Sequence, residues 1–113
     1  MSGPLLRAAA TGVGPIAEAF AAPVGATYQV MQVTLNLNVG AATSEAFTIT
    51  LDADAGAAYD TLLYTLDLSV LPTTDLLWQP NEPFYIADGD ALDVAWANTD
   101  GRTWGLLIAV MEV

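Results

Sequence analysis

The stretch from Thr27 to Val39, TYQVMQVTLNLNV, decides the fold of this chain. Apolar side chains recur at every second position, and polar side chains fill the positions between them. The apolar set is Met31, Val33, Leu35, Leu37 and Val39, and the polar set is Gln32, Thr34, Asn36 and Asn38. A period of two is typical of a β-strand with one buried face and one solvated face. The stretch therefore predicts a long strand in an antiparallel sheet.

Similar segments follow along the chain, separated by turn residues. Residues 46–53 alternate in the same way, with Phe47, Ile49 and Leu51 predicted to point inward. Further strands are expected over residues 59–70, 76–79, 84–87, 91–97 and 103–113, and Asp100-Gly101 predicts a hairpin before the last of them. Short strands, frequent turns and no convincing long helix predict an all-β fold, either an antiparallel β-sandwich or a small jelly-roll barrel.

The first 26 residues are of a different composition, rich in alanine, glycine and proline. Pro4, Pro15 and Pro23 divide them into pieces too short for a stable isolated helix, although a helical turn over residues 16–22 is compatible with the sequence. We expect residues 1–26 to form an extended N-terminal arm before a domain of residues 27–113; a flexible tail is the plainer alternative. The residues with which the arm would bind a neighbour are its larger apolar ones, Leu5, Leu6, Val13, Ile16 and Phe20.

The composition removes most catalytic chemistry. The 113 residues include two arginines and thirteen acids but no lysine, histidine or cysteine, and the net charge is −11. The chain therefore has no imidazole base, no Ser-His or Cys-His pair and no zinc site of the usual kind. We expect no enzymatic activity, no cofactor and no metal. Two isolated positive charges also argue against nucleic acid as a partner.

The charges are unevenly distributed along the chain. Residues 1–44 contain only Arg7 and Glu18, whereas residues 45–113 carry the whole net charge. The uncharged stretch between Glu18 and Glu45 is long enough to span a bilayer. It contains proline, glycine, glutamine and asparagine, and it alternates as a strand from Thr27 onward. We therefore expect no membrane partner.

Two acidic segments resemble sites of known chemistry. Residues 52–56, DADAG, followed by Asp60 are similar to the start of a calcium loop, but the sixth position is Ala57 and the twelfth is Leu63 where that loop needs glycine and glutamate. A second cluster, residues 88–93, places three aspartates around Gly89. Because aspartate and glycine favour tight turns, we interpret both segments as turns, with calcium at the first as the alternative.

The chain carries more apolar residues than a single small domain can hide. Hydrophobic residues make up 54% of it, and the last strand is apolar on both faces. Contiguous exposed apolar surface usually marks an interface, and closed cyclic symmetry is the common form of self-association. We therefore expect an oligomer, with a homotrimer as the preferred form. The expected contact residues of the domain are Leu63, Leu77, Trp78, Phe84, Tyr85, Leu107 and Met111, although core packing is the alternative for the three aromatic ones.

The C-terminal third carries a family resemblance. Residues 83–113, PFYIADGDALDVAWANTDGRTWGLLIAVMEV, resemble the C-terminal half of small jelly-roll modules in virion proteins of tailed bacteriophages. The shared pattern is a strand, a Gly-Asp turn, a strand with alternating valine and tryptophan, a hairpin and an apolar closing strand. An N-terminal arm before a compact β-domain is also similar to head decoration, or cement, proteins. The metal-binding histidines of cupins, which share the Gly-Asp turn, are absent here.

The resemblance implies a non-enzymatic virion structural protein. A capsid decoration protein of this kind lies on the outer capsid surface as a homotrimer, binds the major capsid protein or another virion protein, and anchors through its arm. The alternative is a carbohydrate-binding module of a tail fibre or adhesin, in which Trp78, Trp96 and Trp104 would stack on sugar rings. Alternation places Trp96 and Trp104 inward, which argues against that alternative.

Overall fold

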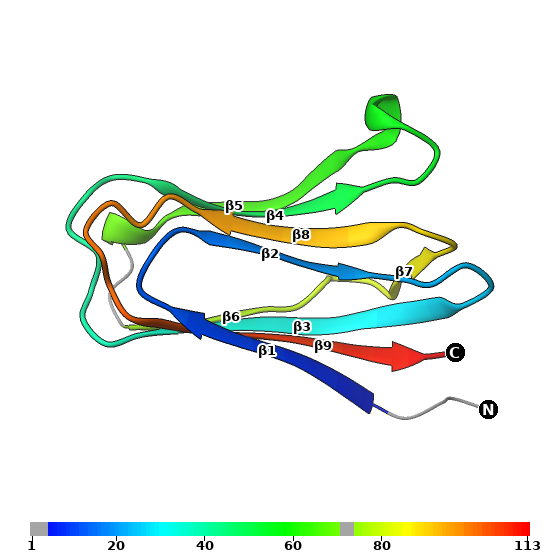
Figure 1. Ribbon diagram of the computed structural model, residues 1–113, viewed down its shortest axis with the longest axis horizontal. Helices are drawn as coiled ribbons and strands as arrows, with labels where there is room; N and C mark the ends of the chain where they lie inside the picture. Colours follow the sequence, from blue (N-terminus) through cyan, green and yellow to red (C-terminus); the bar gives the residue numbers. More distant parts are fainter. Residues whose placement is uncertain (1–4, 71–73) are drawn as a thin grey trace.

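The computed structural model describes residues 5–70 and 74–113, and more than half of these residues lie in strands (Figure 1). Two antiparallel sheets pack face to face as a β-sandwich, which confirms the predicted all-β fold (Figure 1). Two short 3-10 turns, Ala57–Tyr59 and Leu68–Val70, are the only helical elements in the described residues. None of the described helices is long and apolar enough to cross a membrane.

The two sheets differ in size, and each contains strands from both halves of the chain. The five-stranded sheet has the order β1-β9-β3-β6, and β7 also pairs with β3; its strands are β1 Leu5–Gly12, β3 Thr27–Leu37, β6 Asp75–Trp78, β7 Phe84–Ala87 and β9 Trp104–Glu112. The four-stranded sheet has the order β2-β8-β4-β5; its strands are β2 Ile16–Ala21, β4 Ala46–Asp52, β5 Thr61–Asp67 and β8 Ala91–Trp96. The chain crosses between the sheets at most of its connections, so each sheet combines segments far apart in sequence.

Strand β3 lies at the centre of the five-stranded sheet, and its alternation is confirmed over most of its length. From Val33 to Leu37 the apolar side chains are no more than 2% exposed. At Met31 a bulge shifts the register with β9 by one residue, so the inward position before it is Val30 rather than Met31. Val39, also expected to point inward, lies beyond the strand end and is 52% exposed.

Strands β4 and β5 form a hairpin, and only β4 follows the predicted alternation throughout. Phe47 and Ile49 are completely buried, as predicted. The register between β4 and β5 shifts between Ile49 and Thr50. As a result Leu62 is 56% exposed, and Leu63, expected to point outward, packs against the core. A bulge reverses every side chain beyond it because the strand period is two.

The N-terminal residues depart most from expectation, because residues 5–21 belong to the sandwich. β1 pairs with β9 over all eight of its residues, and β2 pairs with β8 over all six. These edge strands replace the expected separate arm, and β2 also replaces the helical turn considered for residues 16–22. Pairing with a sheet edge provides hydrogen-bond partners for backbone groups that a detached arm would leave unpaired. Residues 1–4 of the expected arm lie outside the described residues.

The turn over residues 98–102 joins the two sheets instead of closing a hairpin, because β8 and β9 lie in different sheets. Asn98 organises this turn and is only 3% exposed. Its amide nitrogen donates to the backbone carbonyls of Val13 at 3.3 Å, Gly14 at 2.9 Å and Arg102 at 2.9 Å, while its amide oxygen accepts from the Arg102 N–H at 2.9 Å. One side chain thus ties the β8–β9 turn to the turn between β1 and β2.

Candidate interaction face

The outer face of the five-stranded sheet, which points away from the core, gathers most of the exposed apolar side chains predicted to make contacts. Two apolar rows cross it. We call the first the Leu107 row, made of Ala9, Leu107, Thr34 and Leu77. We call the second the Met111 row, made of Leu5, Met111, Gln29 and Tyr85. Neighbours within a row lie opposite each other on adjacent strands, so each row is a continuous strip.

A polar row separates the two apolar rows. It contains Arg7, Ala109 and Gln32, which pair across β1, β9 and β3. The side chain of Gln32 accepts a hydrogen bond from the amide of Gln79 at 3.3 Å, which extends this row past the end of β6. The face therefore offers hydrogen-bonding groups between two apolar strips, the mixture found in many protein interfaces.

A shallow groove of about 790 Å³ follows the Leu107 row. It is lined by the large side chains of Leu77 and Leu107 and by the small residues Ala9 and Gly105. A large side chain beside a small one leaves a hollow on a sheet surface, because strand side chains stand perpendicular to the sheet. The sequence gives no signal for Ala9 or Gly105, since small residues occur equally on buried and exposed faces.

Three of the expected contact residues of the domain lie elsewhere. Trp78 packs between the sheets, with its ring centroid 6.4 Å from that of Tyr64. Phe84 and Leu63 are also partly buried against the core. Leu63 is expected as a contact from its nominal strand face, and Trp78 and Phe84 from their positions near strand ends. The structure packs all three partly against the core. Core packing, the alternative for Trp78 and Phe84, describes their buried sides, and both also line a hollow at the surface with Leu63.

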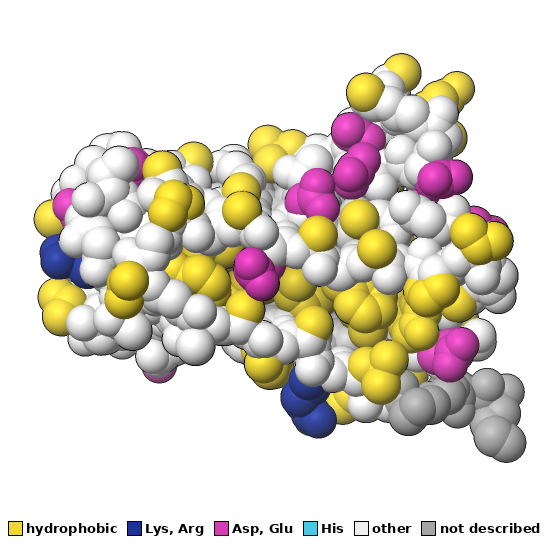
Figure 2. Space-filling view, viewed as in Figure 1, with side chains coloured by type: hydrophobic (Ala, Val, Ile, Leu, Met, Phe, Trp, Pro, Cys, Tyr) yellow, Lys and Arg dark blue, Asp and Glu magenta, His cyan; other side chains and the backbone are white. Residues whose placement is uncertain are grey.

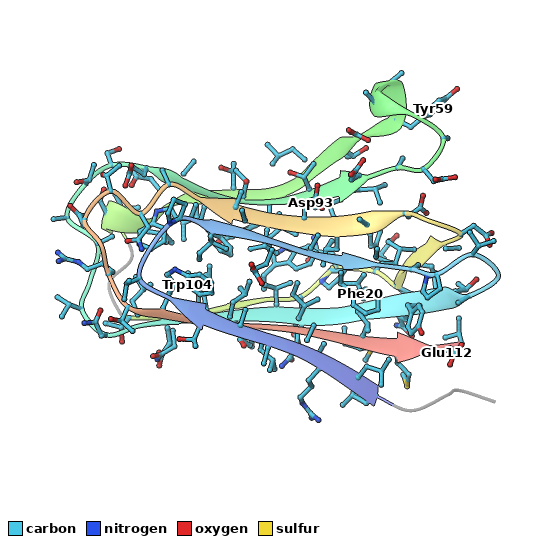
Figure 3. All side chains as sticks on the ribbon, in the orientation of Figure 1. Phe20, Tyr59, Asp93, Trp104 and Glu112 are labelled. Atoms are coloured by element: carbon cyan, nitrogen blue, oxygen red, sulfur yellow. The ribbon has the colours of Figure 1, made fainter. Side chains whose placement is uncertain are left out.

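The apolar residues expected to bind a neighbour through the arm separate into two groups. Ile16 is 2% exposed in the core, and Phe20 packs edge-to-face on Tyr28 with 5.2 Å between ring centroids. Figure 3 shows Phe20 between the two sheets. The other three are exposed: Leu5 by 42%, Leu6 by 38% and Val13 by 62%. Of the five, only Leu5 lies on the outer face described above.

The acidic side chains gather away from this face. Figure 2 shows a group of them at the upper right, beside the loop between β4 and β5. Asp60 accepts a hydrogen bond from the Ala53 N–H at 2.9 Å, and Asp90 accepts one from the Asp54 N–H at 2.9 Å. Because these carboxylates accept hydrogen bonds from backbone N–H groups, we interpret the segment as a turn. Among the described residues, no three acidic side chains are arranged to hold a metal ion.

Asp93 lies on β8 beside this acidic group, and burial raises its pKa above the usual 3.8, with further contributions from Asp52 and Asp60. A raised carboxyl pKa means that ionisation destabilises the folded chain. Asp93→Asn should therefore increase the free energy of unfolding at neutral pH, by no more than about 1 kcal/mol because the group is largely solvated. The gain should vanish below pH 3.8, where the wild-type group is protonated in both states. Thermal unfolding at both pH values tests this, and a gain that persisted in acid would contradict it.

Two of the three tryptophans are too deeply buried to stack on a ligand. Trp96 is 2% exposed and Trp104 is 5% exposed, and the indole N–H of Trp104 donates to the Gly14 carbonyl at 2.8 Å. The third, Trp78, is packed on Tyr64 as described above. Trp78 remains partly exposed and lines a hollow at the surface with Leu63 and Phe84. Two of the three tryptophans on which the carbohydrate-binding alternative rests are therefore buried.

Comparison with known proteins adds little to this geometry. The chain matches no family model and no curated protein. One similar solved structure is Aeromonas hydrophila PliG, a periplasmic lysozyme inhibitor of g-type lysozyme. It is 14% identical, the match covers 95% of this chain and 84% of that chain, and the TM-score is 0.37. A likeness at this level carries no inference about function.

Proposed function

We propose that this chain is a non-enzymatic virion structural protein that decorates the outer surface of a capsid. In this role it assembles as a homotrimer and binds the major capsid protein or another virion protein. The outer face of the five-stranded sheet makes both the contacts between copies and the contacts with the other virion protein. The observation that carries the proposal is the pair of apolar rows on that face. The resemblance of residues 83–113 to phage jelly-roll modules supports the virion setting.

The exposed apolar residues of the two rows are large enough to drive association. Leu77 is 58% exposed, Tyr85 is 51% exposed and Leu5 is 42% exposed. Burying such a side chain contributes about 1.5–3 kcal/mol before the costs of association are subtracted. A shell presents many identical sites, so an oligomer held at several of them binds far more tightly than one copy alone.

The charge distribution supports the same orientation. The apolar rows and the polar row between them carry a single charged side chain, Arg7, and Asp75 stands at one end of the groove. The acidic group around Asp93 lies on the other sheet. With a net charge of −11, copies of this chain repel one another most weakly where carboxylates are fewest. We therefore expect the five-stranded sheet to face neighbouring proteins and the acidic sheet to face solvent.

Anchoring through a detached arm is not part of the proposal, because β1 and β2 are strands of the sandwich. Attachment instead depends on a folded surface. This difference has a consequence for experiment: deleting residues 1–26 would remove two edge strands and expose the core, so it would test folding rather than attachment.

The proposal can be tested by locating the chain in virus particles. Particles should be purified on a density gradient from the source whose genome encodes the chain, then probed with an antibody against it. We expect the chain to sediment with the particles at a constant ratio to the major capsid protein and to be labelled on intact particles. A chain found only in the soluble fractions would contradict the proposal.

A further inference from the structure

The two sheets have four edges, and three of them are protected against pairing with another strand. β6 and β7, at one edge, are only four residues long each. β5 is disturbed by the register shift described above and is flanked by 3-10 turns. On β2, the charged Glu18 pairs with Val94, which is 1% exposed, so its side chain points toward the inner face of the sheet. Short strands, bulges and inward-pointing charges are the usual means by which edges avoid pairing.

β1 has none of these protections. Its eight residues, Leu5–Gly12, contain no proline and no acid, and they pair with β9 without a register shift. Figures 1 and 2 show that it lies at the open side of the sandwich next to β2, where apolar side chains are visible between the sheets. Leu6 faces that side and remains 38% exposed. β1 is therefore long and regular, and its inward-facing side chains carry no charge. These are the features of a strand that can pair at its open edge.

The direction of the β1 backbone groups follows from the hydrogen bonds at the ends of β9. The Asn38 N–H donates to the Thr103 carbonyl at 3.0 Å, and the Val113 N–H donates to the Thr27 carbonyl at 3.0 Å. Odd-numbered residues of β9 therefore direct their backbone groups toward β3, and even-numbered ones toward β1. The carbonyl of Trp104, which accepts from the Thr11 hydroxyl of β1 at 2.7 Å, agrees with this alternation.

Alternation then assigns the backbone groups of β1 itself. Its even-numbered residues lie opposite even-numbered residues of β9 and bond to them. Its odd-numbered residues direct both N–H and C=O toward the open edge; these are Leu5, Arg7, Ala9 and Thr11. Four alternate residues of β1 thus direct backbone donors and acceptors toward the open edge.

We propose that β1 is a strand-addition site and that its partner is β1 of a second copy of this chain, paired antiparallel about a two-fold axis at Ala8. In this register Arg7 lies opposite the partner's Ala9, and Leu5 lies opposite the partner's Thr11. All four edge-facing residues of each copy are then hydrogen-bonded. The two five-stranded sheets become one continuous sheet across the axis.

Charge and side-chain size favour a second copy as the occupant. β1 carries no carboxylate, whereas the other edge strands contain Glu18, Asp67 and Asp75. Two copies with a net charge of −11 can therefore approach at β1 with the least repulsion. The alanines around the axis allow close approach, and Leu6 is covered by the partner's Ala10. An axis at Arg7 would place the two guanidinium groups opposite each other, which excludes that register.

This contact is separate from the outer face invoked under the proposed function. With the two-fold axes perpendicular to the three-fold axis and meeting it, β1 pairing joins two trimers into a closed assembly. Loss of β1 pairing should therefore halve the molar mass of the assembly, whereas loss of the outer-face contact should leave a two-fold dimer. The two ideas fail in distinguishable ways.

Proline substitution in the full chain tests the edge. Ala9→Pro removes an N–H that faces the open edge, so the fold should persist while pairing is blocked. Ala19→Pro is the matched control on β2. The Ala22 N–H donates to the Asp90 carbonyl at 2.8 Å, so the even-numbered residues of β2 direct their backbone groups toward β8. The N–H of Ala19 therefore faces the open edge of the four-stranded sheet. Light scattering should show that Ala9→Pro halves the molar mass of the wild-type assembly and that Ala19→Pro leaves it unchanged, with circular dichroism confirming that both are folded.

Cross-linking tests the register by an independent route. The chain contains no cysteine, so a single Ala8→Cys substitution places one thiol at the axis in each copy. Opposite residues that are not hydrogen-bonded to each other lie about 4.5 Å apart at Cα, within reach of a disulfide. Mild oxidation should yield a disulfide-linked dimer of Ala8→Cys far faster than of the control Ala19→Cys.

Three results would overturn the proposal. The first is a wild-type chain that remains at its monomer mass of 11.8 kDa at every concentration, as expected if β1 pairs only with a strand of another protein. The second is an assembly whose mass Ala9→Pro does not change. The third is equal rates of cross-linking for Ala8→Cys and Ala19→Cys, which would exclude an axis at Ala8.

Discussion

Asn98→Ala should lower the free energy of unfolding by about 3 kcal/mol or more, the largest effect expected of any single polar substitution in this chain. The side chain is 3% exposed, and its amide satisfies three backbone carbonyls and one backbone N–H. Each buried polar group left without a partner costs about 1–3 kcal/mol. Asn98 also has φ of 49°, in the left-handed region that alanine adopts poorly. Urea unfolding followed by fluorescence of the buried tryptophans measures the loss.

A second variant separates the side-chain contribution from the backbone contribution. Asn98→Gly removes the same amide but tolerates the left-handed φ, so it should recover up to about 1 kcal/mol relative to alanine. As a control, Asp88→Ala changes another non-glycine residue with φ of 49°, which is exposed and whose carboxylate accepts a hydrogen bond from the Gly25 N–H. If Asn98→Ala were no more destabilising than Asp88→Ala, the tie between the two turns would not be the reason for the effect.

Leu107→Asp should weaken association through the outer face by about 100-fold or more. Leu107 lies in the groove at the centre of its row, and residues at the centre of an interface carry most of its binding energy. An aspartate there would be desolvated opposite another acidic copy and would have no cation in its row to pair with. Because Leu107 is only partly buried in the single chain, the fold should be retained. Sedimentation analysis across a range of concentrations measures the change.

The matched control for this substitution is Leu62→Asp. Leu62 is 56% exposed on β5, in the other sheet, and lies outside the two rows. It adds the same charge to the same protein, so it should leave association nearly unchanged. If both variants weakened association equally, the cause would be the added net charge, and the outer face would not be the contact surface.

The fold of the central strands could be predicted from sequence, whereas the edges could not. In β3 and β4, large apolar residues alternate with polar ones because one face of each strand lies against the other sheet. β1 lacks that contrast, since Ala8, Ala9 and Ala10 occupy both of its faces. An edge strand buries too little for its pattern to be distinctive. In β2 the alternation exists, but Glu18 stands at an inward position and conceals it.

The candidate face was predictable to the extent that it is made of large apolar residues. Composition and alternation predict Leu77, Leu107 and Met111 as contacts, and a position near a strand end predicts Tyr85. The structure brings all four together on one face. Their grouping depends on the strand order, because β9 lies between β1 and β3 in space but last in sequence. Leu63 was misassigned because no sequence signal marks the bulge in the β4–β5 pair.

The central claim is that the outer face of the five-stranded sheet binds neighbouring proteins on a capsid. An electron cryomicroscopy reconstruction of the virus particle tests it most directly, because the sandwich measures 42 × 30 × 24 Å and can be placed in such a map. We expect copies of the sandwich on the outer surface of the capsid, with Leu77 and Leu107 in contact with a neighbouring protein and the acidic group around Asp93 facing solvent. A particle without this density, or copies whose Leu107 row faces solvent, would contradict it.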